Sequence, residues 1–209
     1  MIVIDEQHKF GVEQRNKIRD KGIYANLIVM SATPIPRSLA LTIYGDLDVS
    51  VIKTKPMGRK SIKTKWIKNK NEEKKMYEFI DDKIKEGRQI YVVSPLISDS
   101  DKLNLSSAEA TFEEYKEKFP QYTIGLLHGK LNSKDKDKVM EEFKSNQIDI
   151  LISTTVVEVG VNVPNSTIII ILSAERFGLS SLHQLRGRVG RSSMQAYCFL
   201  VSNTKNEIS

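Results

Sequence analysis

The sequence predicts an α/β protein in which helices cover both faces of a parallel sheet. Short apolar runs rich in β-branched residues recur along the chain, and polar residues follow five of them directly. Runs this short and this apolar are typical of strands buried on both faces. The segments between them, such as 72–85 and 133–144, have helical character. Strands that alternate with helices in this way build parallel sheets.

Each of the five runs ends at a polar tip. In chain order they are 2–4 before Asp5-Glu6, 27–30 before Ser31-Ala32-Thr33, 91–93 before Ser94, 148–152 before Ser153-Thr154-Thr155, and 167–172 before Ser173. In a parallel sheet, ligands bind outside the carboxyl ends of the strands. Chemistry is therefore expected where these polar residues converge.

A domain boundary is predicted near residue 55, where Pro56, Gly58 and basic residues interrupt the pattern. Two strands precede it, too few for a complete doubly wound domain, so residues 1–54 are expected to be the C-terminal part of a first domain. Residues 55–209 are expected to form a second domain, and 98–107 a mobile loop. Six strands are expected in that second domain, near 62–67, 89–94, 123–127, 148–152, 167–172 and 196–201.

The composition is that of a globular chain, with 40% hydrophobic and 28% charged residues among 209. No apolar stretch approaches the roughly 18 residues that span a bilayer, and no secretory signal pattern opens the chain, so neither membrane insertion nor secretion is expected. The single cysteine, Cys198, cannot form an internal disulfide, and His8, His128 and His183 are too scattered for zinc spacing. A reducing cytoplasm is the expected location.

One basic band interrupts an otherwise near-neutral chain. Between residues 53 and 70 there are eight lysines and arginines and no acidic residue, whereas the net charge of the whole chain is only +6. Such a band suits a polyanion such as nucleic acid. A solvated, lysine-rich linker would have the same composition, so the band alone leaves both interpretations open.

The acidic pair Asp5-Glu6 follows the first predicted strand directly. A carboxylate at such a tip can hold Mg²⁺ while its neighbour orients and deprotonates an attacking water. Acidic residues also open loops and cap helices, so the pair is a weak signal by itself. Ser31 and Thr33, at the end of the second strand, could equally be a helix N-cap before Pro34.

The segment 184–191 is the most informative stretch. It holds three of the chain's nine arginines, in a chain with 23 lysines. A guanidinium pairs bidentately with phosphate and spreads its charge over a transferring phosphoryl group, which lysine cannot do. Upstream, Thr154 and Thr155 place hydroxyls at a strand tip, where they suit phosphate oxygens.

One apparent phosphate loop does not qualify. The stretch 125–131 has three residues between its glycines and Leu131 after the lysine, whereas the phosphate loop of nucleotide hydrolases requires four and then Ser or Thr. No other stretch of the sequence satisfies that pattern. His128 is expected to be a loop residue or a nucleic-acid contact.

The ordered motifs resemble motifs II, III, V and VI of superfamily 2 helicases over essentially the whole chain. They are the acidic pair, Ser31-Ala32-Thr33, Thr154-Thr155 before Gly160, and Gln184-x-x-Gly-Arg188-x-Gly-Arg191. Within the superfamily, 5–12, 31–37, 91–97 and 158–165 look like the RecG family of bacterial ATP-dependent DNA helicases. The coupling factor of transcription and repair shares the motor motifs and is the nearest alternative.

This resemblance implies RecA-like domains, ATP and Mg²⁺ as cofactors, and branched double-stranded DNA as partner. By position it implies Mg²⁺ binding by Asp5, activation of the hydrolytic water by Glu6, and links from the nucleotide to the other domain through Gln7 and His8. It also implies a γ-phosphate neighbour in Gln184, arginine fingers in Arg188 and Arg191, coupling by Ser31 and Thr33, DNA-backbone contacts by Thr154 and Thr155, and a cleft lined by Glu158, Gly160 and Asn162.

Two departures from the family pattern are evident. Asn162 stands where the family usually has aspartate. The family's DNA-binding wedge and its phosphate-loop segment have no counterpart here, so the chain is expected to be a motor fragment, inactive alone, of a monomeric cytoplasmic, nucleoid-associated parent. An RNA helicase and a catalytically silent nucleic-acid-binding module remain alternative functions, the latter with salt-dependent binding through residues 53–70.

Overall fold

The computed structural model divides the chain into two compact units, Met1–Thr54 and Lys55–Ser209. The first unit contributes a two-stranded parallel sheet and the second a six-stranded one. The structure describes residues 1–5, 26–30, 48, 50–52, 54, 58, 60–95, 101–154 and 163–202, with only the backbone described for Asp5, Leu27 and 101–106.

In the first unit, β1 (Ile2–Asp5) pairs in parallel with β2 (Leu27–Met30). The register joins Asp5 to Met30, so both strands end at the same edge. Ile4 is buried, whereas Val3 and Ile28 are about half exposed.

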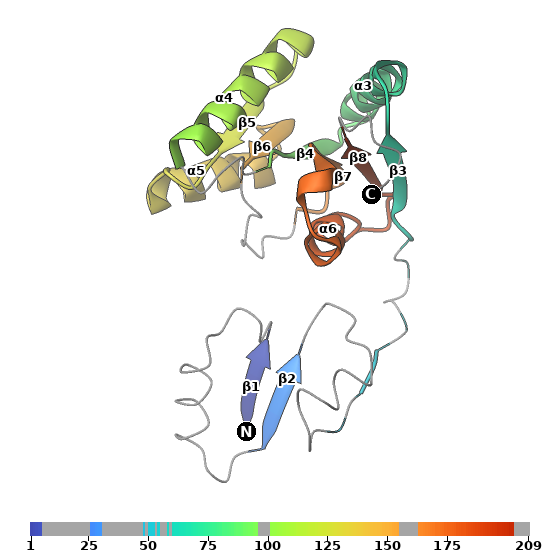
Figure 1. Cartoon of the computed structure of the whole chain (residues 1–209), viewed down its shortest axis with the longest axis vertical. Helices are drawn as coiled ribbons and strands as arrows, with labels where there is room; N and C mark the ends of the chain where they lie inside the picture. Colours follow the sequence, from blue (N-terminus) through green and yellow to red (C-terminus); the bar gives the residue numbers. More distant parts are fainter. Residues whose placement is uncertain are drawn as a thin grey trace. The chain divides into compact units, whose positions relative to one another are not determined.

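The second unit contains all six strands that the sequence predicts, which confirms the expected parallel α/β fold. They are β3 (Lys63–Ile67), β4 (Gln89–Val93), β5 (Ile124–Leu127), β6 (Ile150–Ser153), β7 (Ser166–Ile171) and β8 (Tyr197–Val201). Every pairing is parallel, and the spatial order is β3-β8-β7-β4-β6-β5 (Figure 1). Strands β3 and β5 therefore form the two edges of the sheet.

Five helical segments complete this unit among the described residues. They are α3 (Lys70–Lys85), α4 (Asp101–Lys118), α5 (Ser133–Lys144), the 3₁₀ turn η2 (Ala174–Arg176) and α6 (Leu179–Arg186). The helices predicted at 72–85 and 133–144 are confirmed. Each begins at an asparagine cap: the side-chain oxygen of Asn69 accepts from the Glu72 amide, and that of Asn132 from the Asp135 amide, both at 2.9 Å.

The prediction of a loop over 98–107 is wrong for residues 101–107, which form the first part of α4. The second half of this helix buries Tyr115 in the core, and Phe119, directly after the helix, packs in the same cluster. Packing of that half stabilises the helix, which then extends toward its N-terminus through residues of modest helix propensity. Aspartate is favourable in a first helical turn, where Asp101 lies.

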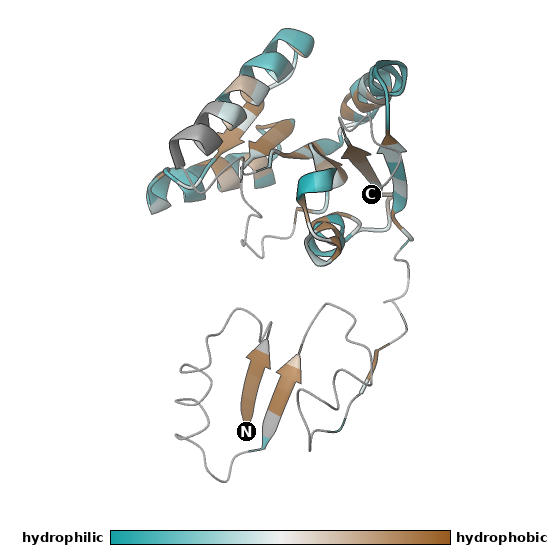
Figure 2. Ribbon diagram, viewed as in Figure 1, coloured by the Kyte–Doolittle hydropathy of each residue, from teal (hydrophilic) through white to brown (hydrophobic). Residues whose placement is uncertain are grey.

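The core has two layers, one on each face of the sheet. Ile168 and Ile170 of β7 pack in the layer that includes residues of α3 and α4, and Ile169 and Ile171 in the layer that includes residues of α5 and α6. All four side chains are fully buried. Successive strand residues point to opposite faces, so an unbroken apolar run is what a strand covered on both sides requires. Figure 2 shows these strands as the most hydrophobic part of the unit.

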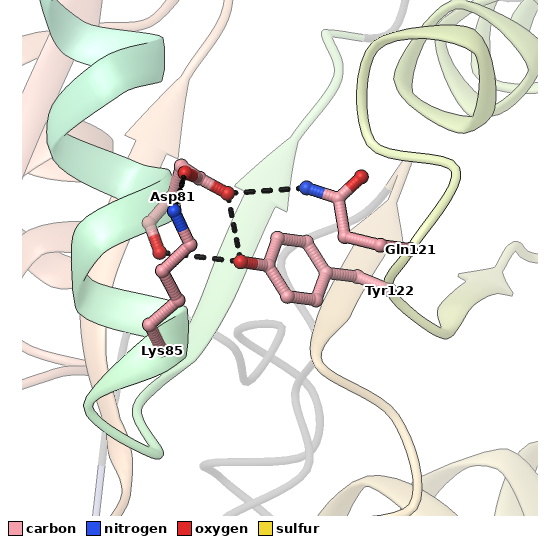
Figure 3. A network of polar contacts seen from close by, with 4 residues as sticks. All are labelled: Asp81, Lys85, Gln121 and Tyr122. Carbon is pink, nitrogen blue, oxygen red and sulfur yellow. Dashed lines mark hydrogen bonds and ion pairs between the residues drawn. The ribbon is translucent and has the colours of Figure 1, made fainter.

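On the face covered by α3 and α4, a polar cluster joins α3 to the segment after α4 (Figure 3). The Tyr122 hydroxyl donates to Asp81 Oδ1 at 2.7 Å, and Gln121 Nε2 donates to the same oxygen at 3.1 Å. Lys85 forms an ion pair with Asp81. The Lys85 ammonium, followed by the Tyr122 hydroxyl, lowers the pKa of the Asp81 carboxyl. The carboxylate thereby ties two segments 40 residues apart.

Gln89, at the start of β4, is buried and bonds to the chain on either side of the α5–β6 connection. Its Nε2 donates to the carbonyl of Phe143 at 2.5 Å and to that of Ile148 at 2.7 Å. We expect Gln89→Ala to lower the free energy of unfolding by about 2 kcal/mol, because it leaves both carbonyls without this donor. Urea unfolding of the 209-residue chain measures the change.

Gln121→Ala is the matched control for this prediction. Its amide is exposed and donates to Asp81 across the surface cluster. We expect a change within about 0.5 kcal/mol, which is usual for surface positions. Equal urea midpoints for both variants would contradict the role assigned to Gln89.

Candidate functional site

The carboxyl edge of the second sheet gathers polar residues from adjacent strands, as the sequence predicts for a binding edge. The Ser94 amide donates to the Ser153 carbonyl at 2.9 Å, and the Thr154 amide donates to the Leu127 carbonyl at 3.2 Å. Ser94, His128 and Thr154 are therefore the first residues beyond three neighbouring strands, β4, β5 and β6. Edges of this kind are where open α/β sheets bind their ligands.

His128 at this edge is held largely neutral. Burial lowers the pKa of its imidazole, the nearby Lys130 and Lys136 lower it further, and Glu109 opposes them. Its Nδ1 is enclosed and has no hydrogen-bond partner among the described residues. A neutral imidazole beside lysines can accept a hydrogen bond or donate one to an anionic group.

Thr154 is nearly fully buried at this edge. The remaining residues expected in this motif, namely Thr155, Glu158, Gly160 and Asn162, lie outside the described residues. The same holds for Glu6, Gln7, His8, Ser31 and Thr33 of the first unit. Asp5, the first residue of the acidic pair, is the last residue of β1.

The arginine loop, residues 187–191, follows α6 directly. Leu185 and Val189 anchor it in the core, and the Arg188 amide donates to the Leu185 carbonyl at 3.0 Å. Arg188 is half-buried, whereas Arg191 is exposed. The turn between them needs glycine, because Gly190 has φ +76°.

Tyr91 brings this loop together with the carboxyl edge. Its phenol lies in the interior, and burial raises its pKa; the hydroxyl of Ser153 and the positive charge of Arg188 act in the opposite direction. Tyr91 packs in one buried cluster with Leu185 and Val189, and it pairs with Leu151 of β6, the strand that ends at Ser153. The run 91–93 was predicted as a strand, but nothing in it singled out Tyr91 as the neighbour of Arg188.

Gln184 lies on α6, half-buried, one residue before the buried Leu185. Gln184 therefore lies on the helix that leads directly into the arginine loop. The exposed His183 of this helix lies with its Nδ1 3.2 Å from Arg186 Nη2.

The stretch 125–131 is not a phosphate loop. Gly125 lies inside β5, and a Cβ atom there would approach Ile148 Cδ1 to 2.7 Å. The glycine is needed for close packing between the strand and the chain before β6. Lys136 Nζ donates to the Gly129 carbonyl at 2.9 Å, which ties the following turn to α5.

The basic band reaches the open edge of the sheet. Of its members, Lys60, Lys63, Lys65, Lys68 and Lys70 are described, and all are exposed. Lys63 and Lys65 of β3, together with Lys75 of α3, border a cavity of about 320 Å³ with an apolar floor. On β3, Trp66 is 45% exposed, and Lys68 Nζ lies 4.5 Å from the centre of its ring.

Neither a metal-ligand cluster nor a membrane-spanning helix is found in the described part of the chain. Within the described residues, no group of three or more His, Cys, Asp or Glu side chains is placed to hold a metal ion. No helix in the same part of the chain is both long and apolar enough to cross a membrane.

Comparison with known proteins identifies the family. A family model described as the helicase conserved C-terminal domain matches residues 71–193, more than half of the chain. The chain belongs to this family. The match begins within α3 and extends past the arginine loop, so it covers both the hydroxyl motif and the arginine motif.

The similar proteins include ATP-dependent DNA helicase RecG of Bacillus subtilis (strain 168) and of Streptococcus pneumoniae serotype 4, each 51% identical over 208 residues. These alignments cover 99% of this chain and 30% and 31% of the relatives, so the chain spans about a third of their length. The resemblance to superfamily 2 helicases and to the RecG family is thereby confirmed.

Solved structures agree with this assignment. A structure of RecG bound to a three-way DNA junction matches with a TM-score of 0.74 and 44% identity, covering 98% of this chain and 26% of that one. Helicase Lhr of Mycobacterium smegmatis, bound to single-stranded DNA and AMP-PNP, matches with a TM-score of 0.68 at 17% identity, covering 97% and 28%. The second likeness concerns the fold alone, which is the RecA-like arrangement.

Proposed function

We propose that the chain is the C-terminal motor part of an ATP-dependent translocase that remodels branched double-stranded DNA. Residues 1–54 then belong to a first RecA-like domain and 55–209 form the second. The observation that carries the proposal is the packing of Tyr91 in one buried cluster with Leu185 and Val189, because it holds the arginine loop against β4, a strand that ends at the carboxyl edge. The high identity to RecG proteins supports DNA as the substrate class.

The residues fit the nucleotide and metal that this function needs. Carboxylates such as Asp5 and Glu6 are the ligands that Mg²⁺ prefers, and they can also orient a water. Gln184, Arg188 and Arg191 supply an amide and two guanidinium groups for phosphate oxygens. When bound, Mg²⁺ neutralises charge on the phosphates; within this chain, Arg188 and Arg191 stabilise the charge that develops on the transferring group.

The DNA-facing groups are expected at the polar edges of both units. Thr154, Thr155, Ser31 and Thr33 offer hydroxyls for backbone phosphates and couple their movement to hydrolysis. Glu158, Gly160 and Asn162 are expected to act toward the nucleotide. The lysines of 53–70 add a sequence-independent attraction that weakens as salt rises.

The test is ATP turnover by the full-length protein on a three-way DNA junction and on linear duplex of equal length. We expect stronger stimulation by the junction, because the proposed motor acts at a branch. The isolated 209-residue chain, which has no phosphate-loop sequence, is expected to hydrolyse ATP negligibly.

The remaining outcomes separate the alternatives. Equal stimulation by junction and linear duplex would favour a coupling motor of transcription and repair, and stimulation by duplex RNA would favour an RNA helicase. DNA-stimulated turnover by the isolated chain would overturn the assignment of the phosphate-loop function to another segment.

A further inference from the structure

Residues 60–62, which lead into β3, contact the segment that follows the arginine loop; we call these three residues the connector. At its end, the Lys63 amide donates to the Ala196 carbonyl at 3.0 Å, and β3 begins there beside β8. The chain therefore passes from the first unit into the second next to the residues that follow the arginine loop.

Gln195 forms hydrogen bonds with the connector and with Arg88. Its Nε2 donates to the Ser61 carbonyl of the connector at 2.7 Å and to the carbonyl of Ala196 at 3.0 Å. Its own carbonyl accepts from Arg88 Nη1 at 3.0 Å, and Arg88 Nε lies 3.1 Å from Glu86 Oε2. The segment after the arginine loop is thus tied to the connector on one side and to the α3–β4 turn on the other.

A direct packing contact joins the connector to the arginine loop itself. A Cβ atom on Gly190 would lie 3.1 Å from Ile62 Cγ1 and 3.3 Å from Ala196 Cβ. Ile62 is half-buried and packs with the core layer that contains Val189. Because packed interiors leave little free space, a displacement of Ile62 must move Gly190 or open a void beside it.

We infer that Ile62 and Gln195 are positioning residues, which set the arginine loop according to where the connector lies. This inference rests on the proposed role of Arg188 and Arg191 at the nucleotide phosphates. A displacement of the connector would reach the arginine loop through these contacts. The position of the arginine loop would then depend on the connector as well as on the nucleotide.

Hydrogen–deuterium exchange of the 209-residue chain tests the coupling without any need for activity. We expect Gln195→Ala to raise the exchange rate of amides 187–191 about tenfold or more, and Gln195→Glu to do the same, since a carboxylate would face two carbonyl oxygens. Gln121→Ala, which removes a surface amide bonded to Asp81, is the matched control and should leave these amides unchanged. Faster exchange only at 61–63 and 195–197 would overturn the inference.

The full-length protein provides the second readout, because here the change is made in the connector and read at the arginines. We expect Ile62→Ala to lower kcat for DNA-stimulated ATP hydrolysis about fivefold or more, with KM for ATP within about twofold, and Ile62→Val to restore most of it. Equal loss of kcat in both variants, or a change in KM alone, would contradict positioning. If Arg191→Ala keeps full turnover, the proposed function fails while the exchange result still decides the coupling.

Discussion

Arg191→Ala in the full-length protein is expected to lower the rate of ATP hydrolysis by about 10³-fold or more. An arginine that reaches a transferring phosphoryl group stabilises the charge of the transition state, and such residues contribute on the order of 10³ to 10⁵ in rate. Arg191 is exposed, at the end of a loop that Val189 anchors in the core. Steady-state turnover at saturating DNA measures the loss, and a fluorescent ATP analogue measures binding, which should persist.

Two companion variants sharpen this result. Arg191→Lys retains the charge without the planar fork, so we expect it to recover only a small part of the activity. Arg176→Ala removes an exposed arginine of η2, a short distance earlier in the same family match, and should leave turnover within about twofold. Full turnover by Arg191→Ala would show that the arginine loop does not act on the phosphoryl group.

Ile170→Ala is expected to lower the free energy of unfolding by about 3 to 5 kcal/mol. Ile170 is fully buried near the carboxyl end of β7, between Val92 of β4 and Phe199 of β8. Truncation removes buried apolar surface and leaves a cavity between the sheet and the layer of α3 and α4, which a close-packed interior cannot refill. No other single change considered for this chain is expected to destabilise it more.

The single cysteine makes this loss measurable in the chain as it stands. Cys198 is fully buried, and burial raises the pKa of its thiol to about 12, so it reacts with a thiol reagent only when the sheet opens. A loss of 3 kcal/mol or more corresponds to labelling faster by about two orders of magnitude or more. Leu179→Ala, at a side chain that is 87% exposed, should label at the original rate. Unchanged labelling of Ile170→Ala would contradict the central position of β7 in the core.

The strands were predictable because their signal is local. The run 168–172 can be buried on both faces only as an inner strand of a covered sheet, and the structure has it as β7, with strands on either side. The asparagines that cap α3 and α5 likewise act within four residues of themselves. The start of α4 was missed because the residues that stabilise that helix, Tyr115 and Phe119 among them, lie beyond the polar segment and act through tertiary packing.

Some residues of the candidate site were likewise predictable from local sequence, whereas others were revealed only by tertiary packing. Gln184, Arg188 and Arg191 could be singled out from residue type and spacing within eight positions. Tyr91 could not, because its packing with Leu185 and Val189 joins residues more than 90 positions apart and arises only in the folded core. Gly125 shows the opposite case, since a spacing close to that of a phosphate loop reflects packing against Ile148.

By itself, the sequence determined the class of fold, the six strands of the second unit and the chemical types in each motif, because periodicity, residue type and spacing are properties of neighbouring residues. Only the tertiary structure decided which motifs meet and how the arginine loop is held. The contacts of Gln195 with Ser61 and of Gly190 with Ile62 join residues more than 120 positions apart. Such contacts depend on strand order, which places β3 beside β8 although they are the first and last strands of the sheet.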